Sequence, residues 1–300
     1  MYTILGATGN TGSIIANTLL ANKQKVRVVG RSANKLQSFV SKGAEAFVAD
    51  LTDAEALTRA FTGARAAYVL IPPDLSSTDY RAYQDRVSDA IRAAIERAGV
   101  PHAVTLSSIG ADKKEGTGPV AGLHDLEQKL NAVSGLNVVH LRTVYFMENL
   151  LLQVSVIKGF GIIGAPLPGD LKLAMIATKD IGAAAAEALL KLDFSGEQTR
   201  ELQGQRDVSY NEVTPIIGKA IGKPDLNFVQ LPPEQFRSAV QQSGISANVA
   251  DLVLEMCGAM ISGHMKALEQ RSARNTTPTS IETFVKDTFL PAYQGKAASA

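Results

Sequence analysis

The sequence has one cysteine, no tryptophan and no long apolar run among its 300 residues. A single cysteine excludes an intrachain disulfide framework. Because Cys257 lies in an apolar, helix-like stretch, we expect a small buried side chain rather than a reactive thiol. Charged residues interrupt the most apolar stretch, residues 171–192, so we expect no membrane span. The first residues resemble a strand rather than a secretory signal, which predicts a cytoplasmic protein.

An excess of charge of either sign is also missing. Lys and Arg number 30, and Asp and Glu number 29, for a formal net charge of +1. Without a basic run, we expect no nucleic-acid partner. The four histidines and the cysteine lack metal-ligand spacing, so we expect no metal site. His102 and His140 lie beside or within apolar strands and are expected to find hydrogen-bond partners locally.

The first half of the chain alternates short apolar runs with helical patterns. Such alternation predicts parallel strands joined by helices, and strands covered on both faces have near-continuous apolar sequences. The predicted strands span residues 2–5, 26–29, 46–48, 66–71, 103–106 and 138–141. The predicted helices span residues 11–20, 34–41, 53–61, 79–98 and 120–132. We therefore expect a Rossmann-like, doubly wound parallel α/β sheet over residues 1–150.

The second half differs in composition, with a Gly- and Pro-rich segment at residues 159–169 that predicts a loop with a short strand. Beyond it we expect helices at 180–192 and 210–221, strands at 199–202 and 227–229, and three more helices. Residues 52–55 and 279–282 have capping-box spacing, and the tail after Pro291 is expected to fray. Residues 151–300 are therefore predicted to form a smaller, mostly helical C-terminal lobe, with some interleaving of the two parts.

The strongest motif is the glycine loop, residues 6–12, which follows a strand and begins a helix. Gly6 would allow a tight exit from the strand, Gly9 a close approach of the backbone to a pyrophosphate, and Gly12 close helix packing. The helix N-terminus favours a bound phosphate. A dinucleotide site is therefore predicted, with Gly6, Thr8, Gly9, Asn10, Thr11 and Gly12 as cofactor-binding residues.

The residues after the second strand predict which dinucleotide binds. A site that prefers NAD usually has an acidic residue about 20 positions beyond the loop, but this chain has Arg31 and Ser32, followed by Lys35. An arginine there would hold a 2′-phosphate through charge-assisted hydrogen bonds. NADP(H) is therefore predicted over NAD(H), although Arg31 as an ordinary surface charge is the alternative.

Residues at three further strand ends complete the predicted cofactor site. Asp50 and Leu51 would border the adenine, unless Asp50 only caps the next helix. Ile71 and Pro72 would form a wall of the pocket or present carbonyl groups to it, because proline offers no N–H. Ser107 and Ser108 would lie at the carboxyl edge of the sheet, near the nicotinamide or the substrate.

These segments together resemble the NmrA-like family of atypical short-chain dehydrogenase/reductases. The resemblance covers nearly the whole chain and is carried by residues 6–12, 107–111, 122–127, 141–149 and 177–182. It implies an NADP-binding Rossmann-like domain with a substrate cleft against a small C-terminal lobe. It also implies similarity to quinone, azo or related reductases, or to redox-sensing regulators that bind the cofactor without turnover.

One departure concerns the proton donor. Reductases of the wider superfamily use a Tyr-x-x-x-Lys pair, but the matching positions hold Pro119 and Leu123. The neighbouring His124 is a candidate proton donor or relay, with a helix-surface histidine as the alternative. Ser107 is the other catalytic candidate.

After the sixth strand, Tyr145, Phe146 and Met147 would line an apolar pocket for a flat substrate, and Asn149 would orient it. Core packing is the alternative for Phe146 and Met147. The favoured function is an NADPH-dependent reductase that passes hydride to a quinone-like or other conjugated small molecule. The alternative is a non-catalytic NADP(H) sensor acting through a protein partner, and a homodimer is left open. A nucleotide-sugar epimerase is disfavoured by the missing tyrosine.

Overall fold

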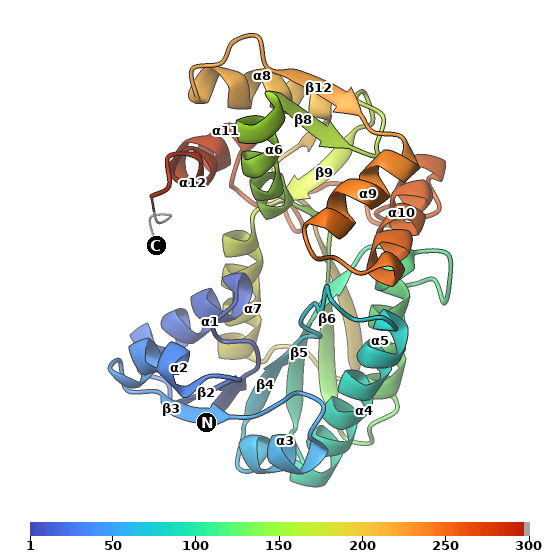
Figure 1. Cartoon of the computed structure of the whole chain (residues 1–300). Helices are drawn as coiled ribbons and strands as arrows, with labels where there is room; N and C mark the ends of the chain where they lie inside the picture. The colour runs from blue at the N-terminus through green and yellow to red at the C-terminus, as the bar shows by residue number, and fades with distance from the viewer. Residues whose placement is uncertain (297–300) are drawn as a thin grey trace.

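A seven-stranded parallel sheet forms the centre of the molecule (Figure 1), in a computed structural model that describes residues 1–296. The strand order is β10-β6-β5-β4-β1-β2-β3, and every neighbouring pair is parallel. The strands are β1 (Tyr2–Ile4), β2 (Val26–Gly30), β3 (Glu45–Val48), β4 (Ala66–Val69), β5 (His102–Ser108), β6 (Asn137–Thr143) and β10 (Glu197–Leu202). The predicted doubly wound α/β class is confirmed.

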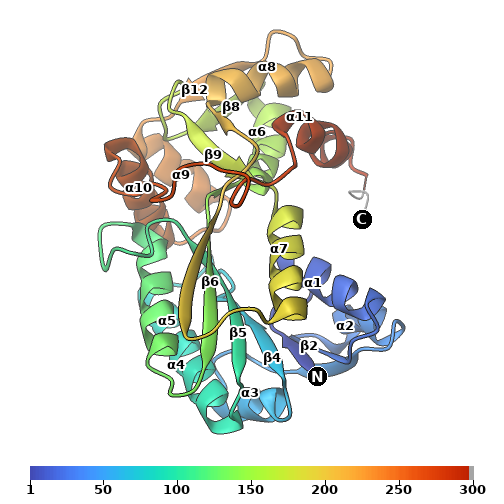
Figure 2. The ribbon, with the colours of Figure 1, turned by 180° about the vertical axis from the view of Figure 1, so that it is seen from behind.

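Helices cover both faces of this sheet (Figures 1 and 2). The buried residues of α1 (Asn10–Ala21), α2 (Ala33–Val40) and α7 (Thr178–Lys191) belong to the core on one face. Those of α3 (Ala54–Phe61), α4 (Tyr80–Ala98) and α5 (Ala121–Asn131) belong to the core on the other. Because both faces are covered, the central strand β1 is wholly buried, as its apolar sequence predicts.

The remaining elements form a smaller part above the carboxyl edge of the sheet. They include two small sheets, ordered β11-β9-β7 and β12-β8. Their strands are β7 (Tyr145–Phe146), β8 (Ile162–Ala165), β9 (Leu173–Ile176), β11 (Asp207–Val208) and β12 (Asn227–Gln230). The helical segments are η1 (Gly118–Val120), η2 (Met147–Leu152), α6 (Gln153–Phe160), α8 (Tyr210–Ala220), α9 (Pro233–Gln242), α10 (Ala247–Ser262), α11 (Ile281–Phe284), η3 (Val285–Phe289) and α12 (Leu290–Tyr293).

The two parts of the chain interleave. After β9 the chain returns to the large sheet, where α7 packs on α1 and β10 pairs with β6 as the edge strand. A β-carbon at Gly182 of α7 would lie 2.6 Å from the Ile14 side chain of α1, so a glycine is needed for this close helix contact. Residues 178–202 therefore support the predicted dinucleotide-binding half although they follow residue 150.

The structure differs from the predicted elements in a few places. The caps of α3 and α11 are Asp53 and Ser280, one residue after the predicted Thr52 and Thr279. The short strands β7, β9 and β11 are absent from the predictions. The predicted frayed tail is helical as far as Tyr293, and residues 297–300 lie outside the described part.

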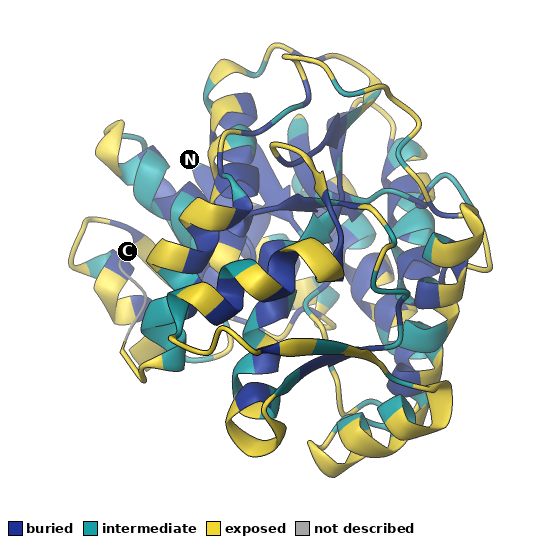
Figure 3. Cartoon of the chain, turned by 90° about the horizontal axis from the view of Figure 1, so that it is seen from above, coloured by how far each residue is buried: buried dark blue, intermediate teal, exposed yellow. Residues whose placement is uncertain are grey.

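Burial follows the layers (Figure 3), with exposed residues concentrated on the outer sides of the helices.

Cys257 is buried as predicted, and burial raises the pKa of its thiol to about 12. His140 has hydrogen-bond partners, as predicted, and these are Thr105 and Asn131, each at 2.8 Å. His102 differs, because its Nδ1 has no partner among residues 1–296. No helix in that range is long and apolar enough to cross a membrane.

Candidate functional site

The glycine loop joins β1 to α1 in a conformation that depends on its glycines. Gly6 has a φ of +60°, which favours glycine, and a β-carbon there would lie 2.9 Å from a methyl group of Leu70. A β-carbon at Gly12 would lie 2.3 Å from the Gly6 carbonyl oxygen. The start of α1 therefore packs directly on the strand exit, as the motif predicts.

The exposed part of this loop faces solvent at the helix start, where Thr8, Gly9 and Asn10 are exposed. The first helical hydrogen bond runs from the Ser13 N–H to the Gly9 carbonyl at 3.0 Å. The N–H groups of residues 10–12 precede it and have no hydrogen-bond acceptor within residues 1–296, so they can bind an anion at the positive end of the helix. The Thr11 side chain differs from expectation, because its hydroxyl is buried against the Tyr68 hydroxyl at 2.8 Å.

The segment after β2 presents a cation at the same edge. Arg31 and Lys35 are exposed, Ser32 is the N-cap of α2, and neither cation has an ion-pair partner within residues 1–296. Arg31 lies close enough to Asp50 to contribute to lowering the pKa of that carboxyl, although hydrogen bonds from Thr52 are the larger cause. A positive group thus stands where the sequence predicts recognition of a 2′-phosphate.

The two predicted residues that follow β3, Asp50 and Leu51, differ in exposure. Asp50 Oδ1 accepts hydrogen bonds from Thr52 N–H at 2.8 Å and Oγ1 at 2.7 Å, and Asp53 caps α3. The Asp50 side chain is exposed, so its second oxygen is free for a ligand. Leu51 instead is buried in the core that includes α3, which disfavours the predicted contact with the adenine.

An apolar cavity of about 540 Å³ opens at the carboxyl edge beside this loop. Leu70 joins the two features, because its side chain lies beside Gly6 and also lines the cavity. The walls come from the ends of β4, β5 and β6 and from α10 above them. Of the predicted residues, Ile71, Ser107, Ser108, Tyr145, Phe146 and Asn149 line the cavity.

Three polar side chains, from β5, α5 and β6, hold the cavity floor in place. The Ser107 hydroxyl donates to Glu127 Oε1 at 2.6 Å. Glu127, which is 2% exposed, also accepts two hydrogen bonds from Arg142, at 3.0 and 2.5 Å. Since the Ser107 proton is committed to Glu127, Ser107 offers only acceptor lone pairs to a ligand, which disfavours it as a proton donor.

Comparison with known proteins decides the family. The family model for the NmrA-like family matches residues 2–284. The chain belongs to the NmrA-like family. The chain is 24% identical to Prestalk A differentiation protein A of Dictyostelium discoideum over 300 aligned positions, covering 95% of this chain and 91% of that protein.

Two solved structures resemble the fold of this NmrA-like chain. The NADPH-dependent quinone oxidoreductase QOR2 of Escherichia coli, in complex with NADPH, has a TM-score of 0.79 and 23% identity, and the match covers 96% of this chain and all of that one. The triphenylmethane reductase of a Citrobacter species, in complex with NADP(H), has a TM-score of 0.77 and 18% identity. That match covers 94% of this chain and 98% of the other.

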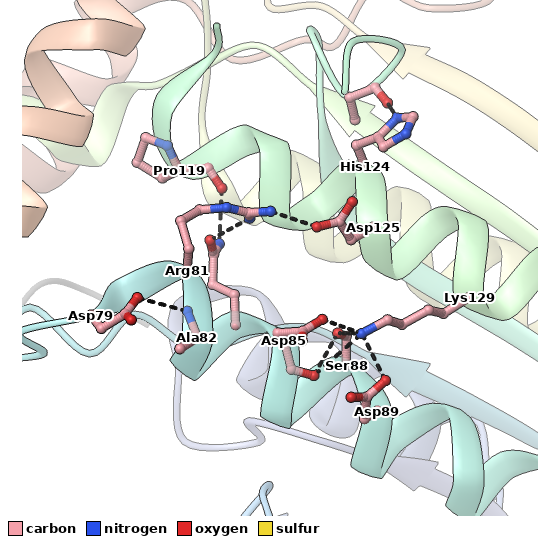
Figure 4. A network of polar contacts seen from close by, with 12 residues as sticks. Asp79, Arg81, Ala82, Asp85, Ser88, Asp89, Pro119, His124, Asp125 and Lys129 are labelled. Carbon is pink, nitrogen blue, oxygen red and sulfur yellow. Dashed lines mark hydrogen bonds and ion pairs between the residues drawn. The ribbon is translucent and has the colours of Figure 1, made fainter. Parts of the chain in front are cut away.

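The NmrA-like chain departs from the predicted site at His124. This half-buried side chain is outside the cavity lining, and its Nδ1 lies 2.9 Å from the Ala111 carbonyl oxygen. In Figure 4, His124 and Asp125 leave α5 in different directions, and Asp125 pairs with Arg81 at 2.5 Å. Pro119 and Leu123, at the Tyr and Lys positions of the wider superfamily, do line the cavity. Neither residue can transfer a proton.

Met147 is also outside the cavity, because its side chain is 2% exposed and packs in the core of the smaller part.

The sequence predictions missed the residues of α10 that cover the cavity, which are Val249, Val253, Met256 and Met260. Their spacing of three and four residues marks one face of a helix and is the signal that identifies them. Methionine side chains adapt to ligands of different shapes. In residues 1–296 no group of three His, Cys, Asp or Glu side chains is arranged to hold a metal ion.

Proposed function

We propose that this NmrA-like protein is an NADPH-dependent reductase that passes hydride to a quinone-like or other conjugated small molecule. The observation that carries the proposal is the apolar cavity that adjoins the glycine loop through Leu70 at the carboxyl edge of the sheet. Ligands of open α/β sheets bind at this edge. The solved relatives named for quinone and triphenylmethane reduction, both in complex with the NADP cofactor, support the same chemistry.

The residues of the loop fit a dinucleotide. Free N–H groups at residues 10–12 and the glycine at position 9 suit a pyrophosphate, which would approach the backbone closely. Arg31 suits a 2′-phosphate, because no acidic side chain stands at the end of β2 to repel it. Asp50 keeps one carboxylate oxygen for the adenine amine. This donor set favours NADP(H) over NAD(H).

The bound dinucleotide would supply the hydride, and the chain's own residues would orient the acceptor and exclude water. The apolar walls from β4, β5 and α10 suit a flat hydrophobic ring system. Ser107 would accept a hydrogen bond from a ligand N–H, because its own proton is held by Glu127. Arg81, bonded to Asp125, and Gln84, bonded to the Pro119 carbonyl at 2.8 Å, would keep the wall at Pro119 in place.

Steady-state absorbance of NADPH tests this function, with a panel of quinones and dyes as acceptors and NADH in parallel. We expect acceptor-dependent NADPH oxidation and slower oxidation of NADH. Absence of turnover with every acceptor, in protein shown by calorimetry to bind NADPH, would refute the reductase.

The second candidate is an NADP(H) sensor that acts through a protein partner. One observation favours it: Pro119 and Leu123 line the cavity where a Tyr and Lys pair would serve catalysis. In that case NADPH and NADP⁺ would bind without turnover. The amount of partner protein captured by the immobilised chain would then differ between its NADPH-bound and NADP⁺-bound forms. Equal capture with both cofactor forms, and with none, would exclude the sensor.

A further inference from the structure

Two tyrosines meet at the edge of the cavity. Tyr145, in β7, lines the cavity, and its hydroxyl oxygen lies 3.0 Å from that of Tyr210 at the start of α8. Tyr210 is 1% exposed and is not part of the lining. Its ring stacks on Phe228 with a centroid distance of 4.8 Å, which fixes the position of its hydroxyl.

The available acceptors determine which tyrosine donates the proton in the bond between the two hydroxyl groups. In the described residues 1–296, the Tyr210 hydroxyl has the Tyr145 hydroxyl as its partner and no other. If Tyr145 donated, the buried Tyr210 proton would have no acceptor, which is unfavourable for a buried polar group. Tyr210 therefore donates to Tyr145, and the Tyr145 proton is left for a ligand in the cavity.

The surroundings keep both phenols protonated. Burial raises the pKa of Tyr145 and raises that of Tyr210 well above its usual value. The Asn149 side chain and the Tyr210 hydroxyl both act in the opposite direction on the pKa of Tyr145, because they stabilise its ionised form. Tyr145 is thus a neutral donor at neutral pH, with two groups placed to support the charge that it would acquire on losing its proton.

We propose that Tyr145 binds the acceptor oxygen and donates the proton that completes quinone reduction, and that Tyr210 positions that proton. This assignment rests on the reductase function proposed above. A quinone that has accepted one hydride is a hydroquinone monoanion, which still needs one proton. The Tyr145 O–H bond breaks as the new O–H bond to the product oxygen forms, leaving a phenolate that accepts the Tyr210 hydrogen bond. After the hydroquinone leaves, water returns the proton, so the balance is quinone, NADPH and H⁺ to hydroquinone and NADP⁺.

Two acceptors with different proton demands separate this role from a structural one. A quinone needs a hydride and a proton, whereas a cationic triarylmethane dye becomes a neutral product on accepting a hydride alone. In Tyr145→Phe we expect kcat with the quinone to fall by about 100-fold or more, as for loss of a general acid, while kcat with the dye stays near the wild-type value. In Tyr210→Phe, which keeps the ring stacked on Phe228, the same selective loss is expected but is smaller.

Tyr83→Phe is the matched control, because the Tyr83 hydroxyl bonds to the Pro72 carbonyl at 3.0 Å and its ring is not part of the cavity lining. This variant should leave the ratio of the two activities unchanged. Equal losses with both acceptors in Tyr145→Phe, or an unchanged quinone rate, would overturn the assignment.

A binding measurement keeps this test separate from that of the reductase itself. If wild type reduces no acceptor, the proposed function fails on that result alone. Calorimetric titration of a hydroquinone into protein saturated with NADP⁺ then tests the Tyr145 contact without turnover. We expect about fivefold to tenfold weaker binding in Tyr145→Phe than in wild type or Tyr83→Phe, the loss of one hydrogen bond. Equal affinities would overturn the contact.

Discussion

The Ser107 hydroxyl donates its proton to the Glu127 carboxylate over 2.6 Å, at the point where β5 reaches the cavity. Arg142 bonds to both oxygens of the same carboxylate from β6. A serine at this strand end, which the sequence marks as a catalytic candidate, is therefore held in one orientation by a buried ion pair. The pair also stabilises the ionised form of Arg142, since Glu127 raises the pKa of its guanidinium.

Glu127→Ala should lower the free energy of unfolding by about 3–5 kcal/mol, because Arg142 would keep a largely buried charge without a partner. Urea unfolding followed by circular dichroism measures the loss. The control is Glu96→Ala, which breaks an exposed pair with Arg92 and should cost about 1 kcal/mol or less. Equal losses in the two variants would contradict a buried, structural pair.

Gly12→Ala should destabilise the protein by about 1–3 kcal/mol and weaken NADPH binding, since the new methyl group would displace the loop from the Gly6 carbonyl. Gly258→Ala in α10 is the matched control, because its β-carbon would meet no atom within 4 Å. There we expect a gain of up to about 1 kcal/mol from the less flexible unfolded chain. Thermal unfolding with and without NADPH compares them, and a harmless Gly12→Ala would count against the packed loop.

Arg31→Ala should lower the preference for NADPH over NADH by about tenfold or more, because one or more charge-assisted hydrogen bonds to the 2′-phosphate would be lost. Calorimetric titrations with both nucleotides give the ratio of dissociation constants. Arg92→Ala removes a cation from the far part of α4 and should leave that ratio as in wild type. A ratio that is the same in Arg31→Ala would show that Arg31 is an ordinary surface charge.

Acid should destabilise the protein through His140. Burial lowers the pKa of this imidazole to about 4, whereas the unfolded chain titrates near the ordinary 6.5. Between these pH values the unfolded state binds more protons than the folded state. The contribution of neutral His140 to the free energy of unfolding is therefore fully present above pH 6.5. It is lost as the pH falls toward 4, which lowers the free energy of unfolding by up to about 3 kcal/mol. In His140→Gln we expect lower stability at pH 7 but a flatter pH dependence over this range, measured by urea unfolding. An unchanged slope would contradict the buried neutral imidazole, and His264→Gln at an exposed site is the control.

The sequence predicts the large parallel sheet and its helices closely, because the strands are buried on both faces and the helices end at strong signals such as Gly99, which takes a left-handed conformation. The capping residues were each predicted one position early. Where Thr52 and Asp53 stand side by side, either can cap a helix, and tertiary packing decides. The strands β7, β9 and β11 have two to four residues, which is too short for a periodic pattern.

The site was predictable where it follows strand ends and less so where it depends on distant contacts. Gly6, Arg31 and Ser108 lie at the carboxyl edge because parallel strands end there together. Tyr210 lies 65 residues from Tyr145, and no local pattern brings the two hydroxyls together. His124 faces Ala111 because the helix rotation that directs Leu123 to the cavity turns the next residue away.

The most direct measurement of the central claim is transfer of deuterium to a cationic triarylmethane dye from NADPH in which both hydrogens at C4 of the nicotinamide are replaced by deuterium. The dye product keeps the transferred hydrogen on carbon, so mass spectrometry of the bleached dye reports its origin. The account predicts one deuterium per product molecule, with faster bleaching by NADPH than by NADH. Absence of bleaching in protein that binds NADPH, or a product without deuterium, would contradict direct hydride transfer in this cavity.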